Sequence, residues 1–314
     1  MNQNVVLVGA GNMGIEYAKV LKALKKEFVV VGRSEESALG FEQATGIKVV
    51  RGGLNAAWLR SRQDIRKAIV AVDVETLGET ARLLIESGVG SILLEKPGGI
   101  DLVDLKKTAS LAKKKKAKVY LAYNRRFYAS VRKVQERVKE DGGALSVIFE
   151  FNERIDKMEK LRLPEKVMAN WFLANSSHVA DLVFFLAGKP KDLKPYRSGK
   201  LPWHPGGAVF AGAGITTHKT LFAYHANWAS AGRWSVEVTT PRRRLILKPL
   251  EELWEQEKGT FEITRVPLKD EYDRAFKPGL YEEVRAFIEE GESDLPNLTE
   301  HLAHCRYYRM ISGE

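Results

Sequence analysis

Short apolar runs alternate with amphipathic segments of helical period over the first 122 residues of the chain. Nearly continuous apolar runs are typical of strands that are buried on both faces, and helical segments between such strands are typical of βαβ units. Right-handed crossovers between these strands would then produce a doubly wound parallel sheet. We predict six strands, at residues 5–8, 28–31, 47–50, 68–72, 90–94 and 118–122.

The pattern changes after Asp141-Gly142-Gly143, where longer segments alternate apolar and polar residues. This alternation is typical of strands with one buried face and predicts a mostly antiparallel sheet. Residues 189–207 are rich in proline and glycine and are expected to form a long loop. The expected strands lie at residues 145–151, 221–228, 234–239 and 245–247, and the expected helices at 129–139, 179–186, 281–287 and 299–310.

Together the two patterns predict an α/β chain of two domains. Residues 1–122 are expected to form an N-terminal Rossmann domain with a doubly wound parallel sheet. Residues 123–314 are expected to form a C-terminal α/β domain with a large, open, mostly antiparallel sheet. The final helices of this second domain can pack back toward the first.

The turn after the first predicted strand reads Gly9-Ala10-Gly11-Asn12-Met13-Gly14 and opens a predicted helix. Gly9 allows a tight turn, Gly11 lets the backbone approach a pyrophosphate, and Gly14 permits close packing of helix on strand. The free N–H groups of the helix N-terminus, including those near Asn12 and Met13, suit an anion. A purely structural glycine turn is the alternative, but the strand-to-helix placement predicts dinucleotide binding.

The end of the second predicted strand carries Arg33-Ser34 where an NAD-selective site offers an acidic residue to the adenosine ribose. A guanidinium and a hydroxyl can instead hold a 2′-phosphate. The sequence therefore favours NADP(H) over NAD(H). The alternative is that Arg33 is merely exposed and that Ser34 caps the next helix.

Composition narrows the range of partners. The net charge of +10 indicates an anionic ligand, yet the basic residues are dispersed and lack the interleaved aromatic residues of a nucleic-acid surface, so a phosphorylated small molecule is expected rather than nucleic acid. Cys305 is the only cysteine, and neither a basic leader nor a bilayer-spanning apolar segment is found, so we expect a cytoplasmic protein without a membrane partner. His218 and His225 have no further ligands at metal-site spacing, and no metal is expected.

Four short segments follow one another at a characteristic spacing, and in this order they make the chain resemble the glucose-fructose oxidoreductase / inositol dehydrogenase / MocA family over nearly its whole length. They are Gly9 to Gly14, Glu95-Lys96-Pro97, Tyr123-Asn124-Arg125-Arg126-Phe127 and Ser177-His178-Val179-Ala180-Asp181.

The resemblance implies a nicotinamide cofactor, an active site between the two domains, and an open sheet that faces a partner subunit in a homodimer or homotetramer. It also implies that Lys96 reaches the nicotinamide and the reacting hydroxyl and that His178 is the acid/base. Desolvation near a cationic nicotinamide lowers the pKa of a lysine, and histidine exchanges protons near neutrality, so the chemistry agrees. The alternatives are a salt-bridged structural Lys96 and a helix-capping His178.

Other residues are weaker candidates for the two binding sites. Val72, Asp73 and Glu95 lie at predicted strand ends and are expected to contact the cofactor. Arg125 or Arg126 can contact the substrate while the other holds structural elements together. Aromatic rings stack on sugars, although such rings more often belong to the core. The further candidates for a sugar pocket are Tyr128, Trp171, Asn175, Trp203 and His204.

The chain departs from the family pattern just before His178. Many members carry an aspartate one helical turn earlier, where this sequence has Ala174. Asn175 is the nearest polar substitute. Asp181, three residues after His178, could face the same side of a helix, or could form a buried cap or inter-helix bond.

These observations predict an oxidoreductase that moves hydride between C4 of NADP(H), rather than NAD(H), and a carbinol or carbonyl carbon of a sugar-like substrate, phosphorylated or nucleotide-linked. Two alternatives remain open: a non-catalytic sensor or co-repressor on the same fold, and a cofactor-assisted glycosidase. Net formation of NADPH distinguishes the dehydrogenase from both.

Overall fold

The computed structural model describes residues 4–158, 160, 163–289 and 294–314 of the 314-residue chain. The chain divides into two compact units, and each unit is made of two separate stretches of sequence. The first unit comprises Met1–Asn124 and Tyr272–Leu302, and the second comprises Arg125–Glu271 and Ala303–Glu314. One large sheet organises each unit.

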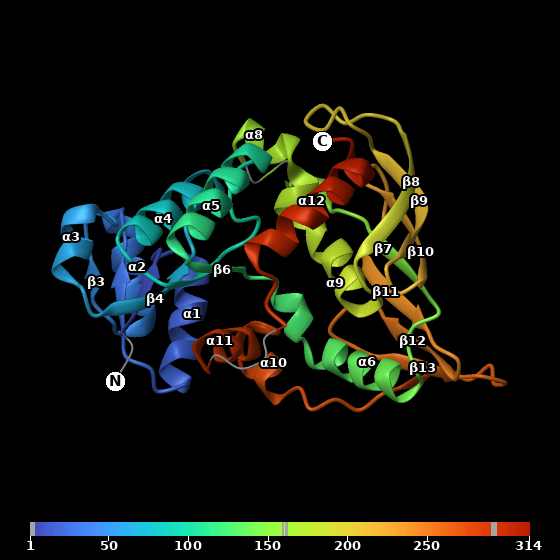
Figure 1. Cartoon of the computed structure of the whole chain (residues 1–314). Coiled ribbons are helices and arrows are strands. Elements are labelled where there is room, and N and C mark those ends of the chain that lie inside the picture. The colour runs from blue at the N-terminus through green and yellow to red at the C-terminus, as the bar shows by residue number, and fades with distance from the viewer. Residues whose placement is uncertain (1–3, 159, 161–162, 290–293) are drawn as a thin grey trace. The chain divides into compact units, whose positions relative to one another are not determined.

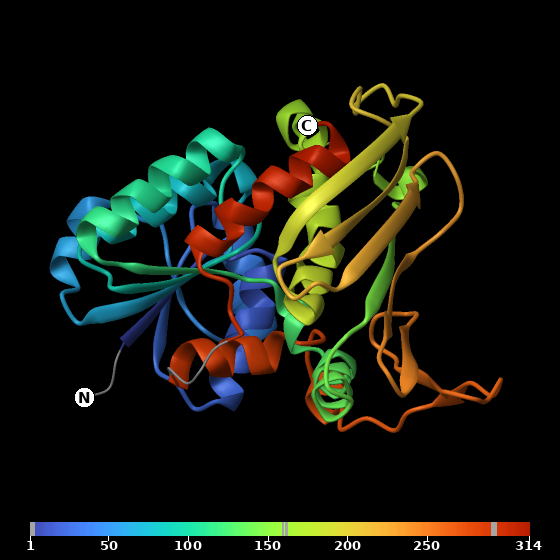
Figure 2. The same ribbon diagram turned by 45° about the vertical axis from the view of Figure 1, so that its right-hand side comes forward.

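Six parallel strands form the sheet of the first unit, in the order β3-β2-β1-β4-β5-β6. The reversal of strand order between β1 and β4 makes the sheet doubly wound, which confirms the predicted fold class (Figure 1). Figure 2 shows α5 on one face of this sheet, with α1 and α11 on the other. The strands are β1 Asn4–Val8, β2 Phe28–Val31, β3 Val49–Val50, β4 Ile65–Val70, β5 Ser91–Leu94 and β6 Lys118–Leu121. The helices between them are α1 Asn12–Ala23, α2 Glu35–Thr45, α3 Ala56–Ser61, α4 Val74–Glu86 and α5 Leu102–Lys115.

The fourth strand was predicted to begin at Ala68, but β4 begins at Ile65. The prediction started late because Lys67, which is buried within the strand, interrupts the apolar pattern. The ammonium of Lys67 donates to the carbonyl oxygens of Phe287 and Ile288, at 3.1 and 2.8 Å. These carbonyls lie near the end of α11 (Leu280–Glu289). They provide hydrogen-bond acceptors for the buried Lys67 ammonium, which makes its burial in the strand tolerable.

The later stretch of the first unit pairs with the edge of its sheet. The N–H of Leu121 donates to the carbonyl of Pro296 at 2.9 Å, and Tyr120 forms an antiparallel bridge with Asn297. The stretch includes α11 and the start of α12 (Leu298–Ser312), and the short α10 (Glu271–Ala275) precedes it. Residues far apart in sequence therefore complete one unit and cover an otherwise open strand edge.

Eight strands form the sheet of the second unit, in the order β14-β13-β12-β11-β7-β10-β9-β8. Only the β7–β10 pair is parallel among the described strands of this sheet, which confirms the predicted mostly antiparallel character. The strands are β7 Ser146–Phe151, β8 Pro190–Ser198, β9 Val209–Thr216, β10 Leu221–Asn227, β11 Trp234–Thr239, β12 Arg243–Leu247, β13 Trp254–Glu257 and β14 Thr264–Arg265.

The prediction of a long loop over residues 189–207 is wrong, because β8 occupies its first half. Pro190 and Pro195 lie within this strand. A proline cannot donate to a neighbouring strand, but β8 is an edge strand that pairs with β9 alone, and edge positions tolerate proline. Proline content therefore indicated the edge of the sheet rather than a break in it.

One face of this sheet packs against helices. The central helix, α9 (Ser177–Ala187), lies against it and ends at Gly188, which has a positive φ of 97° (Figure 1). The other helices are α6 Ala129–Glu140, α7 Ile155–Met158 and α8 Glu165–Ala169. No helix among the described residues is both long and apolar enough to cross a membrane.

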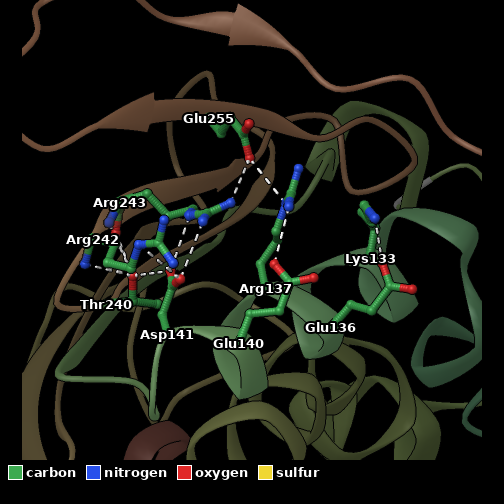
Figure 3. A network of polar contacts seen from close by, with 9 residues as sticks. All are labelled: Lys133, Glu136, Arg137, Glu140, Asp141, Thr240, Arg242, Arg243 and Glu255. Carbon is green, nitrogen blue, oxygen red and sulfur yellow. Dashed lines mark hydrogen bonds and ion pairs between the residues drawn. The ribbon is translucent and has the colours of Figure 1, made fainter.

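A polar network fixes the end of α6 to the turn between β11 and β12 (Figure 3). The fully buried carboxylate of Asp141 accepts a hydrogen bond from Nη2 of Arg243 at 3.1 Å and one from the hydroxyl of Thr240 at 2.7 Å, and it lies 3.0 Å from Nε of Arg243 in an ion pair. Glu255 of β13 lies 3.6 Å from Arg243 and 3.4 Å from Arg137 of α6. Charges buried in this way are tolerated because they are paired.

Candidate functional site

A cavity of about 540 Å³ opens at the carboxyl edge of the parallel sheet, where doubly wound proteins bind ligands. Every predicted cofactor residue except Gly14 lines it. The residues in question are Gly9, Gly11, Asn12, Met13, Arg33, Ser34, Val72, Asp73, Glu95 and Lys96. Gly52, Gly53 and Leu54, which follow β3, line the same cavity and were not predicted.

Gly9 and Gly14 have the structural roles that the spacing predicts. Gly9 has a φ of +117°, and a Cβ there would lie 2.1 Å from the carbonyl oxygen of Ala71. Gly14 packs against this turn, since its added Cβ would lie 2.1 Å from the carbonyl oxygen of Gly9. A Cβ on Gly11 would meet no described atom within 4 Å, so the backbone there faces open space in the cavity wall. No side chain caps α1, which leaves its N-terminal N–H groups for an anion.

The side chains of Arg33 and Ser34 make different contacts. The Ser34 hydroxyl accepts from the N–H of Ser37 at 3.1 Å and is the N-cap of α2, which was the alternative considered from the sequence. The Arg33 guanidinium stays largely exposed at the cavity wall and pairs with the carboxylate of Asp73 at 3.3 Å. The Arg33 guanidinium is thus the charged group of this pair at the cavity wall, beside the carboxylate of Asp73, which follows β4.

Glu95 and Lys96 follow β5 and lie beside a buried tyrosine that the sequence did not reveal. The Tyr17 hydroxyl of α1 donates to Glu95 at 2.8 Å. Burial raises the pKa of the Glu95 carboxyl above its usual range, although the bond from Tyr17 and the charges of Lys96 and Lys277 act in the opposite direction. Lys277 comes from the returning stretch and donates to the Met13 sulfur at 3.0 Å. Tyr17 was hidden by its helical apolar surroundings, and Lys277 by its distance in sequence.

The second unit brings His178 and Arg125 together. His178 is buried at the start of α9, and Nη1 of Arg125 lies 2.8 Å from its Nε2. The Arg125 guanidinium also lies over the ring of Trp234, 5.0 Å from its centroid. His178 is therefore part of a buried cluster, and the N-cap position of α9 is Ser176.

A π-helical turn, Phe172–Ser176, immediately precedes α9. Such turns are rare and occur frequently at functional sites. Ala174 lies within it, so this residue and His178 are not separated by an ordinary α-helical turn. Asn175 donates to the Glu153 carboxylate at 3.0 and 3.1 Å, and Ser176 donates to the same carboxylate at 2.5 Å. Glu153 was not among the predicted site residues.

Asp181 has the structural role that was the alternative considered from the sequence. Its carboxylate accepts two hydrogen bonds from Arg126, both at 2.7 Å, and both side chains are buried. Burial alone would raise the pKa of Asp181, but the Arg126 charge and the nearby His304, whose Nδ1 lies 3.9 Å from the carboxylate, lower it below its usual value. Of the adjacent arginines, Arg126 thus stabilises the unit internally and Arg125 contacts the candidate acid/base.

The aromatic candidates lie largely in the core. Tyr128 and Trp171 are buried. Trp203 stacks on Trp228 with ring centroids 5.8 Å apart, and His204 packs on the same ring at 4.9 Å. Core packing, the more common role of such rings, therefore accounts for Trp203 and His204.

The predicted residues divide between the two units. Lys96 and the predicted cofactor residues belong to the first, whereas His178, Arg125, Tyr128, Trp171 and Asn175 belong to the second. Within the described parts of the chain, no three histidine, cysteine, aspartate or glutamate residues come together as a metal site would require.

The comparison with protein families gives a match within the first unit. Residues 3–123 match the model of the oxidoreductase family with an NAD-binding Rossmann fold. No curated protein matches the chain significantly.

Solved structures share the fold at low identity. A UDP-N-acetylglucosamine 3-dehydrogenase from Acidithiobacillus ferrooxidans is 12% identical with a TM-score of 0.77, covering 100% of this chain and 97% of its own. A putative NADPH-dependent oxidoreductase from Desulfitobacterium hafniense is 18% identical with a TM-score of 0.79, covering 99% and 95%. An Agrobacterium radiobacter oxidoreductase in complex with NAD+, L-tartaric acid and magnesium is 13% identical with a TM-score of 0.79, covering 98% and 95%.

The resemblance read from the sequence is thus confirmed. Residues 3–123 match the glucose-fructose oxidoreductase / inositol dehydrogenase / MocA family model, described as an oxidoreductase family with an NAD-binding Rossmann fold.

Proposed function

We propose that this oxidoreductase transfers hydride between C4 of NADP(H) and a carbinol or carbonyl carbon of a sugar-like substrate. The observation that carries the proposal is the cavity at the carboxyl edge of the parallel sheet, where the glycine turn, Arg33 and Lys96 line one space. The first of these suits a pyrophosphate, the second a 2′-phosphate, and the third a reacting oxygen.

The preference for NADP(H) rests on Arg33. No acidic residue follows β2 directly, and Arg33 offers a guanidinium fork at that strand end. Asp73 holds the guanidinium at the cavity wall without burying it. Because the ion pair is exposed, it contributes little energy and can give way to a phosphate. The NADPH dependence ascribed to the Desulfitobacterium hafniense protein is in keeping with this choice.

Lys96 and His178 are proposed to handle the proton and the developing charge. When bound, the nicotinamide supplies or accepts the hydride. The Lys96 ammonium would polarise the substrate oxygen, and His178 would exchange its proton. Because Ala174 replaces the usual aspartate, His178 is oriented by Arg125 instead. Arg125, Tyr128, Trp171 and Asn175 are proposed to shape the substrate site around it.

A phosphorylated or nucleotide-linked sugar suits the positive net charge of +10. The Acidithiobacillus ferrooxidans protein of the same fold is named for a nucleotide-linked sugar, UDP-N-acetylglucosamine. The single cysteine, Cys305, is buried and fits a reducing compartment, so we propose a cytoplasmic location.

We also propose that the chain forms a homodimer or homotetramer through the outer face of its second sheet. Ile148 of β7 and Leu221 of β10 are 55% and 59% exposed on that face. Tyr196 of β8 is also exposed, and Ala223 of β10 pairs with Ile148 on one side and with Ala213 of β9 on the other. Apolar side chains exposed in this way suit the same surface of a second copy.

The proposal is tested by a substrate screen that follows absorbance at 340 nm. Purified protein with NADP+ would be offered free sugars, sugar phosphates and nucleotide sugars, and with NADPH the corresponding keto compounds. Stoichiometric formation or loss of NADPH with one class supports the proposed function. Release of sugar without a net absorbance change would indicate a glycosidase. Ligand binding with neither signal would indicate a sensor.

A further inference from the structure

A buried histidine in the first unit connects the segment that follows Lys96 to the end of the sixth strand. His301, in α12, is 1% exposed. Its Nε2 lies 3.1 Å from the carbonyl oxygen of Pro97, and its Nδ1 lies 3.3 Å from the hydroxyl oxygen of Tyr123. All three residues belong to the same compact unit.

The chemistry of the partners fixes the direction of the bond to Pro97 and, for the neutral ring, that of the bond from Tyr123. The Pro97 carbonyl can only accept, so Nε2 of His301 carries a hydrogen and donates it. In the neutral ring Nδ1 is then an acceptor, and the Tyr123 hydroxyl donates to it. Each bond polarises the next in such a chain, which strengthens both. The ring is thus held from two sides.

The Pro97 carbonyl belongs to the residue next to Lys96. On the other side of this segment, the N–H of Gly98 donates to the carbonyl of Glu95 at 3.0 Å, and the N–H of Glu95 donates to that of Val70 at 2.9 Å. The Gly98 N–H and the Pro97 carbonyl belong to one peptide group, so Glu95 holds one side of this peptide and His301 holds the other. Lys96 lines the cavity at the carboxyl edge of the parallel sheet, and its backbone lies within the segment that these hydrogen bonds hold.

His301 is itself rigidly placed. Asn297 caps α12 by accepting from the N–H of Glu300 at 2.9 Å, and the N–H of His301 donates to the Asn297 carbonyl at 3.0 Å. The bridge between Asn297 and Tyr120 attaches the start of this helix to β6. The imidazole is therefore carried by a helix start that is fixed to the sheet.

We propose that His301, supported by Tyr123, is a positioning residue that sets the direction of the Lys96 ammonium in the cofactor cavity. The inference rests on the proposed function, because it uses the assignment of Lys96 to the nicotinamide end of the cavity. A leucine would fill the same volume but could not hold the Pro97 carbonyl. A glutamine places an amide N–H close to the position of Nε2 and keeps that bond.

The test compares the dissociation constants of NADP+ and NADPH, because only the oxidised nicotinamide is cationic. A correctly placed Lys96 ammonium repels that ring, so Lys96→Met should strengthen NADP+ binding relative to NADPH by about tenfold. His301→Leu should shift the ratio in the same direction by about threefold or more, and Tyr123→Phe by less. His301→Gln should stay near the wild-type ratio. The double variant Lys96→Met/His301→Leu should match Lys96→Met alone, since both changes act through one group.

A lowered Tm in His301→Leu and Tyr123→Phe with an unchanged ratio in both would show a merely structural role and overturn the inference. Tyr123→Phe keeps its shape, so it tests the inference even where His301→Leu fails to fold. An unchanged ratio in Lys96→Met would instead remove Lys96 from the nicotinamide, and the proposed chemistry would fall together with the inference. The two failures are therefore distinguishable.

Discussion

Nη1 of Arg125 donates a 2.8 Å hydrogen bond to Nε2 of the buried His178. A guanidinium has donors only and keeps its charge, so Nε2 must carry a lone pair. The imidazole is therefore neutral with its hydrogen on Nδ1. For Nε2 to exchange a proton with a substrate, Arg125 must first release it, so the arginine controls access to the candidate acid/base.

This tautomer is directly measurable. In 15N-labelled protein at pH 8, long-range proton–nitrogen NMR should show His178 with its hydrogen on Nδ1. His301, which donates from Nε2 to the Pro97 carbonyl, should show the opposite tautomer in the same spectrum and is an internal control. Arg125→Leu should remove the preference at His178 and leave His301 unchanged. A hydrogen on Nε2 of His178 in the wild type would contradict the arrangement.

Arg33→Ala should weaken NADPH binding by about 1 to 3 kcal/mol, the range for a lost charge-assisted hydrogen bond, and leave NADH binding nearly unchanged. Fluorescence titration with both cofactors measures this. Asp73→Asn is the matched control: it removes the carboxylate that pairs with Arg33 and should leave NADPH binding equal or stronger. Equal losses for both cofactors in Arg33→Ala would refute the NADP(H) assignment.

Lys96→Ala and His178→Ala should each lower kcat by about a hundredfold to ten-thousandfold, with little change in cofactor affinity, because a positioned acid/base group acts in the transition state. The loss for His178 should be the smaller one, since no aspartate precedes it. Steady-state kinetics and cofactor titration measure the two effects once a substrate is known.

Ala174→Asp tests the departure from the family within the same assay. A rise in activity would indicate an impaired form of the family mechanism, and a fall would indicate that the substrate needs the space. Near wild-type turnover in both Lys96→Ala and His178→Ala would contradict the proposed chemistry and favour the sensor.

The buried pair of Arg126 and Asp181 should dominate the stability of the second unit. Asp181→Asn or Arg126→Met should each cost about 3 to 5 kcal/mol of unfolding free energy, because one buried charge loses its partner. The double variant Arg126→Met/Asp181→Leu should lose less than either single variant. Urea unfolding at pH 7 measures all three. Similar losses for the single and double variants would contradict a charge-pair role.

The same pair gives a pH dependence with a definite sign. The pKa of Asp181 is lower in the folded protein than in the unfolded chain, since Arg126 and His304 together outweigh burial. The contribution is therefore complete above the unfolded pKa of about 3.9 and is lost as the pH falls through the lower folded pKa. Wild-type stability should fall more steeply than that of Asp181→Asn in this acid range.

Sedimentation at micromolar concentration should show a dimer or tetramer with little monomer. Ile148→Lys combined with Leu221→Lys places charges on the outer face of the second sheet and should produce monomers. Val103→Asp is the control, because Val103 is an exposed apolar residue on α5, in the other unit. A wild-type monomer would refute the proposed interface.

The parallel sheet could be predicted from sequence because its strands are buried on both faces and form continuous apolar runs. The second sheet was harder to predict. The Ala- and Gly-rich β9 and the polar β13 carry little of the expected alternation, and the prolines of β8 suggested a loop.

The candidate site could be predicted only where chemistry follows local order. The glycine turn, Arg33 and Lys96 each lie at a strand end, so their placement follows from the strand pattern. Tyr17, Lys277 and His301 reach Glu95, Met13 and Pro97 from distant parts of the chain, and no periodicity reveals such pairings. Asn175 was the nearest polar residue in sequence, but its amide bonds with Glu153 instead.

The two-stretch composition of each unit constrains how the protein can be made. A ribosome that has delivered residue 124 has supplied all six strands of the parallel sheet, but Pro296 and His301 are not yet synthesised. Until about 180 further residues emerge, the edge of β6 has no cover and the segment after Lys96 has no clamp. The nascent N-terminal unit is thus exposed to mispairing throughout synthesis of the second. A fragment ending at Asn124 should for the same reason be aggregation-prone, although it contains the whole glycine turn.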